Sequence, residues 1–246
     1  MTTAYISQTQ FGKLEEFNLQ VARGQIQGHS TVNIYGYQGA ISTTSVPVWE
    51  NVTAYTFPAS AITMYVSGTN GDTCRITVVG LDSLYRPISE TVVMTGATPV
   101  ATIKQFLRIN SMFVATDSLS NPAGVVYLKN LAATVTYAQI NAGIGRTQMA
   151  IYTVPAGYTF FLQRVALYTS LNGNDYVTYQ NRTTSPTGVV QVTQQAPLAT
   201  LYDALRIMPR PFLEKTDIQL FCAVKNGTGA VAVAQEGYLI KNETGY

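Results

Sequence analysis

The sequence predicts an all-β protein built from two tandem antiparallel β-sandwiches of the jelly-roll type, with an extended N-terminal arm in front of them. Three observations predict this fold. Short segments of alternating apolar and polar residues recur at intervals of about 8–12 residues, with Gly, Asn and Pro between them. No apolar pattern of helical period continues for a useful length within these segments. In addition, a unit of roughly 95 residues is used twice along the chain.

The duplication is indicated by two echoes that occur in the same order. Tyr55–Ala59 has the sequence YTFPA, and Tyr152–Ala156 has the sequence YTVPA. Pro99–Ile109 and Pro197–Ile207 share their first, third and fourth residues, and both end in Leu-Arg-Ile. Matched segments at nearly equal spacing indicate a repeated unit. We therefore divide the chain into four parts: an arm at residues 1–45, a first sandwich at 46–137, a linker at 138–146 and a second sandwich at 147–246.

The arm contains a segment, Lys13–Val21, that fits two patterns. Leu14, Phe17 and Val21 have helical spacing, whereas Phe17, Leu19 and Val21 alternate as in a strand. We favour the extended form, because several glycines punctuate the residues that follow. Such an arm either docks on a neighbouring subunit or folds back on its own domain, and the residues favour neither alternative.

Alternation predicts the strands of each sandwich in turn. In the first sandwich they are expected at 48–50, 55–57, 62–66, 74–79, 88–94, 106–109, 111–115, 125–128 and 133–137. In the second sandwich they are expected at 150–154, 158–168, 176–180, 189–192, 205–207, 218–224 and 230–240. Asn70-Gly71 and Asn172-Gly173 are hairpin signals, because Asn-Gly suits the two-residue turns that join antiparallel strands.

The composition limits the classes of partner. Only 11% of the residues are charged, compared with about 25% in typical soluble domains, while 46% are hydrophobic. Such a charge-poor surface fits strands rich in Thr and Tyr, or a protein that partners cover. The net charge is +2 and the basic residues are scattered, so we expect no nucleic-acid partner.

Membrane and secretory signals are not predicted either. No apolar run approaches the ~20 residues that span a bilayer, and the first residues lack the basic and apolar regions of a signal peptide. We therefore expect no membrane partner and assembly in a cytoplasm. Cys74 and Cys222 lie in different repeats, and free buried thiols are favoured over a disulfide between them.

Candidate catalytic residues are sparse. His29 is the single histidine, and its neighbours do not form a triad, whose members converge from separate segments. One histidine and two distant cysteines do not make a zinc site, and the acidic residues are too scattered for a calcium loop. A hydrolase with paired carboxylates is the best enzymatic alternative, with Glu50, Glu90, Asp203 and Asp217 at strand-like positions. We predict no enzymatic activity, no catalytic residue, no cofactor and no metal.

Sugar binding is a further alternative, because aromatic rings stack on the apolar faces of sugars. Sixteen tyrosines and Trp49 could provide such platforms. Tyrosine is also a good strand former and is enriched in protein interfaces. An exposed row of aromatic side chains would therefore favour sugar binding, whereas buried tyrosines would favour assembly with other proteins.

Arg108 and Arg206 are the polar residues that we single out, since each lies in the apolar strand of a repeated motif. An arginine in such a strand needs an acceptor. Each is expected to pair with a carboxylate or with carbonyl groups in its own repeat, or to contact a neighbouring subunit. Together with Tyr55, Tyr152 and Trp49, these arginines are our candidate structural or interface residues.

Several short motifs resemble those of virion structural proteins of tailed bacteriophages, many of them from marine phages. The motifs are VNIYG from Val32, VWE from Val48, YTFP from Tyr55, GLD from Gly80, SETV from Ser89 and FLRI from Phe106. They cover the arm and the first repeat best; the second repeat matches only through Tyr152–Gly157.

The resemblance implies a non-enzymatic particle component that is assembled in the host cytoplasm and resides in the virion. Its partners would be other virion proteins, namely the major capsid protein or portal, neck and tail proteins, together with further copies of itself. We favour capsid decoration, as a cement protein. The alternatives are a neck or tail component (connector, tail tube or fibre base) and a carbohydrate-binding adhesion module.

Overall fold

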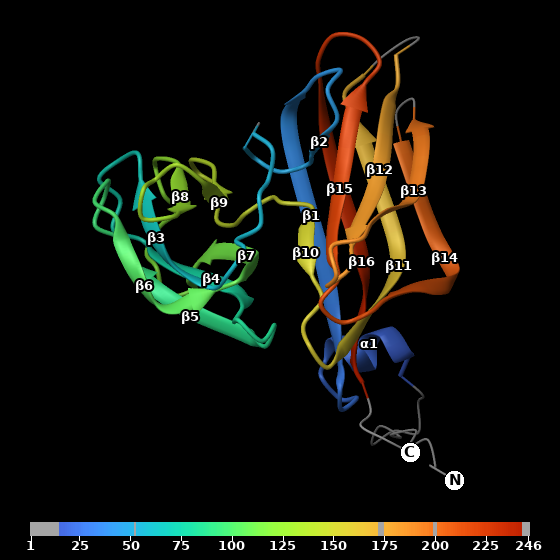
Figure 1. Cartoon of the computed structure of the whole chain (residues 1–246), viewed down its shortest axis with the longest axis horizontal. Helices are drawn as coiled ribbons and strands as arrows, with labels where there is room; N and C mark the ends of the chain where they lie inside the picture. The colour runs from blue at the N-terminus through green and yellow to red at the C-terminus, as the bar shows by residue number, and fades with distance from the viewer. Residues whose placement is uncertain (1–14, 52, 172–174, 199–200, 243–246) are drawn as a thin grey trace.

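The structure is a computed structural model that describes residues 15–51, 53–171, 175–198 and 201–242 (Figure 1). It confirms the predicted all-β fold, and every strand pairing in these residues is antiparallel. The elements are α1 (Phe17–Ala22), β1 (His29–Ile41), β2 (Val46–Pro47), β3 (Ile62–Gly68), β4 (Arg75–Leu81), β5 (Pro87–Val93), β6 (Val100–Phe106), β7 (Arg108–Val114), β8 (Val126–Lys129), β9 (Thr136–Ile140), β10 (Ile151–Thr153), β11 (Tyr158–Thr169), β12 (Val177–Thr184), β13 (Val190–Leu198), β14 (Leu201–Phe212), β15 (Asp217–Val224) and β16 (Gly229–Lys241).

The strands form two sandwiches, each made of two facing sheets. The first sandwich combines the sheet β6-β3-β8-β9 with the sheet β5-β4-β7. The second combines β1-β16-β11-β14 with β10-β15-β12-β13, and β2 pairs with β15 beside the latter. Figure 1 shows the two sandwiches side by side, with β13 and β14 on the side of the second sandwich that is remote from the first.

The same pairing order occurs in both sandwiches. β3 lies between β6 and β8, just as β11 lies between β14 and β16. β4 lies between β5 and β7, just as β12 lies between β13 and β15. Six strands of one sandwich therefore have counterparts in the other, in the same sequence order, as a duplication would leave them.

Alternation buries one face of each strand. In β12, for example, Val177, Tyr179, Asn181 and Thr183 are buried and the residues between them are half-exposed. The two hydrophobic cores are separate: Trp49, Met64, Phe106 and Met112 belong to the first, and Phe160, Tyr179, Leu220 and Val233 to the second. Each sandwich thus has its own core, as expected for units of about a hundred residues.

Part of the predicted N-terminal arm is a strand of the second sandwich. Residues 29–41 form β1, which pairs with β16 along its length, from His29 opposite Ile240 to Ile41 opposite Gly229. β1 is therefore an edge strand of the second sandwich, which corresponds to an arm folded back on the chain itself. The predicted boundaries at residues 45, 137 and 147 otherwise remain predictions.

Several further local predictions are wrong. Residues 48–50 and 55–57 are not strands, and Asn70-Gly71 forms no hairpin, because β3 and β4 on either side of it belong to different sheets. The hairpin predicted at Asn172-Gly173 lies outside the described residues.

Phe17–Ala22 is a short helix and not an extended segment, and its Phe17 ring packs edge-on against Tyr238 at 5.5 Å between ring centroids. The predicted strand at 106–109 is instead divided at Leu107, because β6 ends at Phe106 and β7 begins at Arg108 in the facing sheet.

Candidate functional site

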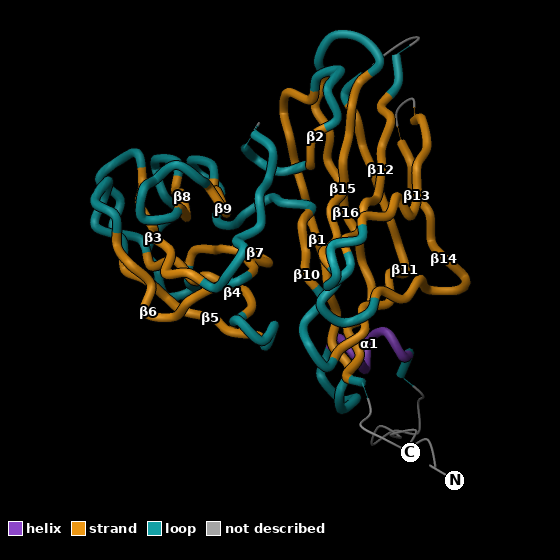
Figure 2. The backbone as a smooth tube through the Cα atoms, in the orientation of Figure 1, coloured by secondary structure: helices purple, strands orange, loops and turns teal. Residues whose placement is uncertain are grey.

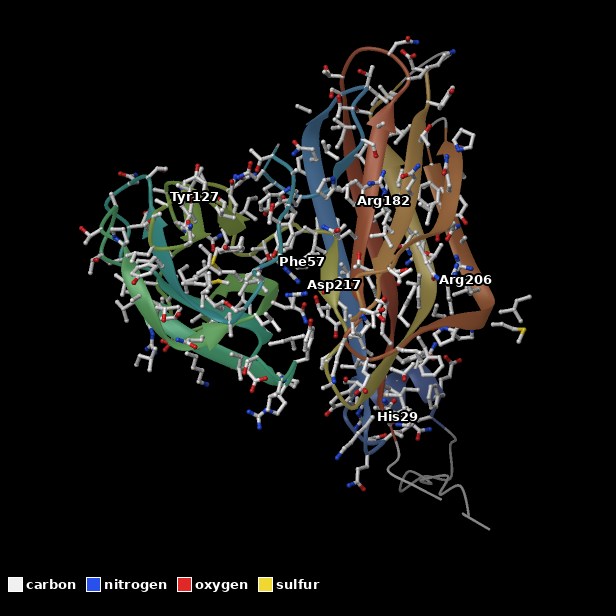
Figure 3. The ribbon with its side chains drawn as sticks, in the orientation of Figure 1. His29, Phe57, Tyr127, Arg182, Arg206 and Asp217 are labelled. Atoms are coloured by element: carbon white, nitrogen blue, oxygen red, sulfur yellow. The ribbon has the colours of Figure 1, made fainter. Side chains whose placement is uncertain are left out.

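The two sandwiches meet at a buried ion pair. Arg108 is the first residue of β7, and Asp217 is the first residue of its counterpart β15. The Arg108 guanidinium donates two parallel hydrogen bonds, from Nε to Asp217 Oδ1 at 2.8 Å and from Nη2 to Oδ2 at 3.0 Å. The side chains are only 10% and 7% exposed. In Figure 3, Asp217 and Phe57 lie next to each other between the two sandwiches.

Other groups complete the polar surroundings of this pair. Arg108 Nη1 donates to the carbonyl oxygens of Pro58 and Leu107, at 3.1 and 3.0 Å. Thr153 Oγ1 donates to Asp217 Oδ1 at 2.6 Å, and the Phe57 ring centroid lies 4.6 Å from Cζ of Arg108. Since its charges are paired and its donors are satisfied, the contact is stable as a unit, although removal of either partner would leave a buried charge.

Further hydrogen bonds, most of them to backbone groups, join the two sandwiches near the ion pair. The Asn110 amide bonds in both directions with the backbone of Thr153, at 3.0 and 2.9 Å. The N–H of Thr147 donates to the carbonyl of Met112 at 2.8 Å, and the N–H of Ala156 donates to that of Tyr85 at 2.9 Å. β7 is therefore hydrogen-bonded both to the segment after β9 and to β10.

The chain crosses between the sandwiches twice. The first crossing leads from β2 to β3 and the second from β9 to β10, and both are loops (Figure 2). A cleft of about 300 Å³ lies at this junction between β1, β4 and β7, lined by polar and apolar residues, with Arg146 as the charged one. The hydrogen bonds at the loops and at β7 hold the two sandwiches in one arrangement.

Glu50 is a buried carboxyl group beside the junction. It is 8% exposed, and its Oε1 accepts a hydrogen bond from the backbone N–H of Gln148. Its Oε2 has no hydrogen-bond partner among the described residues. Burial raises the pKa of Glu50 to about 8, although the hydrogen bond from Gln148 acts in the opposite direction. The carboxyl group is therefore mostly protonated at pH 7.

Three of the predicted site residues lie in the cores. Trp49 is fully buried in the first core, and Tyr55 packs edge-on against it with 5.1 Å between the ring centroids. Tyr152 is buried in the second core against Phe160. Burial raises the pKa of both tyrosines. All three side chains are at most 9% exposed, and an interface role for them stays a prediction.

The two predicted arginines are not equivalent in space. Arg108 opens β7 and pairs with the other sandwich, whereas Arg206 lies within β14 and donates a hydrogen bond to Gln194 Oε1. Arg108 thus has the predicted carboxylate partner, but from the other repeat. Arg206 is half-buried and faces β13 together with Tyr202, whose hydroxyl accepts a hydrogen bond from Gln194. The role of both arginines toward a neighbouring subunit stays a prediction.

Three of the four candidate catalytic acids bind groups in different parts of the structure. Asp217 binds Arg108, and Asp203 forms a two-bond ion pair with Arg164 at 2.9 and 2.8 Å. The carboxylate of Glu90 accepts the backbone N–H groups of Ile103 and Lys104. No group of three or more His, Cys, Asp or Glu residues suited to a metal ion occurs in the described parts of the chain.

The cysteines are free and buried, as predicted, with Cys74 in the first core and Cys222 in the second. Burial raises the pKa of the Cys222 thiol. Among the helices of the described residues, none has the length and apolar character needed to cross a membrane.

One set of exposed aliphatic side chains lies at the edge of the second sandwich, where β13 and β14 end their two sheets. The strand registers place Val190 and Val192 on the outer face of one sheet, and Leu201 and Leu205 on the outer face of the other. Its members lie on or next to β13 and β14: Val189, Val190, Val192, Leu201, Leu205, Ile207, Met208 and Leu213. We call this set the β13–β14 surface. Among the described tyrosines, by contrast, only Tyr168 is classed as exposed, and the other rings are buried or half-buried.

Sequence reasoning missed this surface. The sequence predicted only a short strand at 205–207 and no direction for its side chains; in the structure Leu201, Leu205 and Ile207 face outward, while Tyr202 and Arg206 face β13. The signal that could have revealed this orientation is Gln194 on β13. Its side chain can form hydrogen bonds with Arg206 and Tyr202 but not with a leucine.

Comparisons with known proteins do not assign this chain to a family. No family model matches the chain, and no curated protein matches it. One solved structure, described as the structure of infectious bursal disease virus Gt strain, aligns over 89% of this chain and 78% of that chain at 12% identity. The TM-score of 0.21 is too low for the alignment to support an argument about this protein.

Proposed function

We propose that this chain is a non-enzymatic structural subunit of a tailed-bacteriophage virion, which decorates the capsid through protein–protein contacts. The observation that carries the proposal is that the aromatic and the aliphatic side chains of the chain differ in exposure. Apart from Tyr168 and Phe17, the described aromatic side chains are buried or half-buried, while aliphatic side chains are exposed on the β13–β14 surface. Leu201, Leu205 and Ile207 are exposed on the same strand, β14, and clustered exposed apolar side chains are typical of a protein-interaction site.

Two other features support an assembly role. The surface carries few charges, and interface cores are depleted in charge. The two sandwiches are joined by a buried ion pair and by backbone hydrogen bonds, so the chain acts as one block with two β-sandwich bodies. Many identical copies of such a block would multiply modest contacts in a particle, because linked contacts raise the effective affinity.

The phage assignment rests on the motif resemblance, and the position in the particle is part of the proposal. A neck or tail position is the alternative to capsid decoration. The carbohydrate-binding alternative requires a row of exposed aromatic rings. Among the described residues, Tyr168 is exposed at 48% and Phe17 at 48%, and these lie on β11 and on α1 rather than in one row.

Quantitative mass spectrometry of purified particles tests the proposal. The measurement is the number of copies of this chain per portal ring. Copies in the tens, together with weaker shells when the chain is lost, would support capsid decoration. A ratio near one to one or below would support the neck or tail. Absence of the chain from the particle would overturn the structural role.

A further inference from the structure

We propose that the free edge of β1 binds an extended, acidic peptide segment of a partner protein as an added strand. Figure 1 shows β1 at the side of the second sandwich that faces the first. There Thr31, Asn33 and Tyr35 of β1 line the cleft between the sandwiches, together with Arg146. The inference concerns a different surface from the one that carries the proposed function, and it does not depend on the virion assignment.

Two hydrogen bonds fix the direction in which the backbone groups of β1 point. Lys241 donates its N–H to the carbonyl of Gly28 at 2.8 Å, so the backbone groups of Gly28 point toward β16. Tyr37 donates its N–H to the carbonyl of Gln148 at 3.1 Å, on the side away from β16. Along an antiparallel pair, successive residues direct their backbone groups alternately toward and away from the partner strand. Odd-numbered residues of β1 therefore point their backbone groups away from β16.

Thr31, Asn33 and Tyr35 form a row of such outward groups, which we call the β1 edge. The register between β1 and β16 is unbroken from His29 to Gln38, so the alternation holds throughout the row. Among the described residues, no backbone group bonds to the outward N–H and C=O groups of the β1 edge. Alternate residues of a strand lie about 7 Å apart, so the row is about 14 Å long. Its free groups match the backbone of an added strand, which is how many domains bind extended peptides.

The opposite wall of the cleft provides contacts for the side chains of an added strand. Val79 and Leu81 of β4 and Pro87 in β5 contribute apolar groups to this wall. On the β1 side, Thr31 and Asn33 are exposed, so the edge is accessible from solvent. In strand addition, backbone hydrogen bonds give affinity and contacts to alternate side chains give specificity. The cleft offers both, since one wall is a free strand edge and the other is largely apolar.

The charge of the cleft indicates which peptide it selects. Arg146 is exposed and lies two residues before Gln148, whose carbonyl ends the β1 edge. Within the described part of the chain, Arg146 forms no ion pair. A guanidinium group binds a carboxylate through two parallel hydrogen bonds. The chain's own residues 1–14 contain no Asp or Glu, so a partner protein has to supply this group.

Hydrogen exchange of the full chain, followed by NMR, tests strand addition. The probes are two blocked hexapeptides in which threonine and valine alternate and aspartate is either the first or the last residue. A saturating amount of the better probe should slow the exchange of the three amides of the β1 edge by at least about tenfold, because they gain hydrogen bonds. The amides of Val32 and Ile34 serve as internal controls. They point toward β16 with or without the peptide and should change less.

The dissociation constant of the same peptide tests the role of Arg146. Asparagine in place of the aspartate should raise the constant by about tenfold, because the guanidinium group loses its counter-charge. Arg146→Gln should raise the constant equally for the aspartate peptide and abolish the difference between the two peptides. The matched control is Arg75→Gln, since Arg75 pairs with Asp117 outside the cleft. It should leave the constant unchanged, and equal thermal unfolding midpoints would show that both variants keep the fold.

Three results overturn the proposal. The first is that neither probe binds with a dissociation constant below about 1 mM. The second is slow exchange of the β1 edge in the free chain, which would mean that residues of this chain or of a second copy already cover the edge. The third is a constant that depends on neither the aspartate nor Arg146. A chain that binds the probe as expected but is missing from particles would overturn the virion role alone.

Discussion

The Arg108–Asp217 pair stabilises the contact between the sandwiches only as a complete unit. Both side chains are almost fully buried, and the guanidinium also binds the carbonyls of Pro58 and Leu107. A buried ion pair contributes little when compared with a well-packed apolar replacement, but the loss of one partner leaves an uncompensated charge.

We therefore expect Asp217→Asn to lower the free energy of unfolding by about 3–5 kcal/mol, because the guanidinium of Arg108 would remain buried without its counter-charge. Urea unfolding, followed by the fluorescence of the buried Trp49, measures the change. As a control, Arg75→Met removes an ion pair with Asp117 whose side chains are 49% and 56% exposed, and it should cost no more than about 1 kcal/mol. Equal losses in the two variants would contradict the argument.

Glu50 should make stability depend on pH. Its pKa is raised from 4.5 to about 8 in the folded chain, so between these values the folded state holds a proton that the unfolded state has lost. Its contribution is complete below about pH 4.5 and is lost as the pH rises toward 8, at no more than about 1.4 kcal/mol per pH unit. In Glu50→Gln this dependence should vanish. Urea titrations at several pH values test it, and parallel pH profiles for wild type and variant would refute it.

At the scale of single residues, the sequence identified both members of the central ion pair but not their pairing. Arg108 was selected from the repeated motif, and Asp217 was one of four strand-borne acids. They are 109 residues apart and come from different repeats. No periodicity within a segment contains that information, because the pairing depends on how the two sandwiches dock.

At the scale of elements, alternation located most strands of both sandwiches, since a buried face recurs at every second residue. It missed β1, where two of the buried positions are Gly36 and Gln38 and thus carry no apolar signal. It also did not decide α1, because a segment of six residues fitted both the helical spacing and the strand alternation. Of β14 only residues 205–207 were predicted as a strand, and the exposure of its apolar side chains was not.

The edge of β6 provides a test at this scale. Glu90→Ala would remove the acceptor of two backbone N–H groups, those of Ile103 and Lys104. We expect a loss of about 1–3 kcal/mol in the free energy of unfolding, since charge-assisted hydrogen bonds are among the stronger ones. Because the edge would also become open, light scattering on storage should rise.

The control for this edge is Thr91→Ala on the same strand, which removes a hydroxyl contact with Thr77 at an exposed site. It should change stability by less than Glu90→Ala and leave the scattering unchanged. If Glu90→Ala behaves like Thr91→Ala, the carboxylate does not protect the edge.

At the scale of the whole molecule, the contact between the sandwiches couples two otherwise separate cores. No buried residue is shared between the two clusters, although the β10 segment contributes Ile151 to the first core and Tyr152 to the second. The ion pair, the Asn110–Thr153 bonds and the Met112–Thr147 bond link them. Coupling of this kind makes the unfolding of one sandwich destabilise the other.

Calorimetry tests this coupling directly. The wild-type chain should unfold in one transition, whereas the double variant Arg108→Met/Asn110→Ala should unfold in two, since it loses the ion pair and both amide bonds while each core stays intact. Arg75→Met, which lies away from the contact, should keep a single transition. Two transitions in the wild type would show that the sandwiches are energetically independent. A single transition in the double variant would show that the backbone bonds of the loops suffice to couple them.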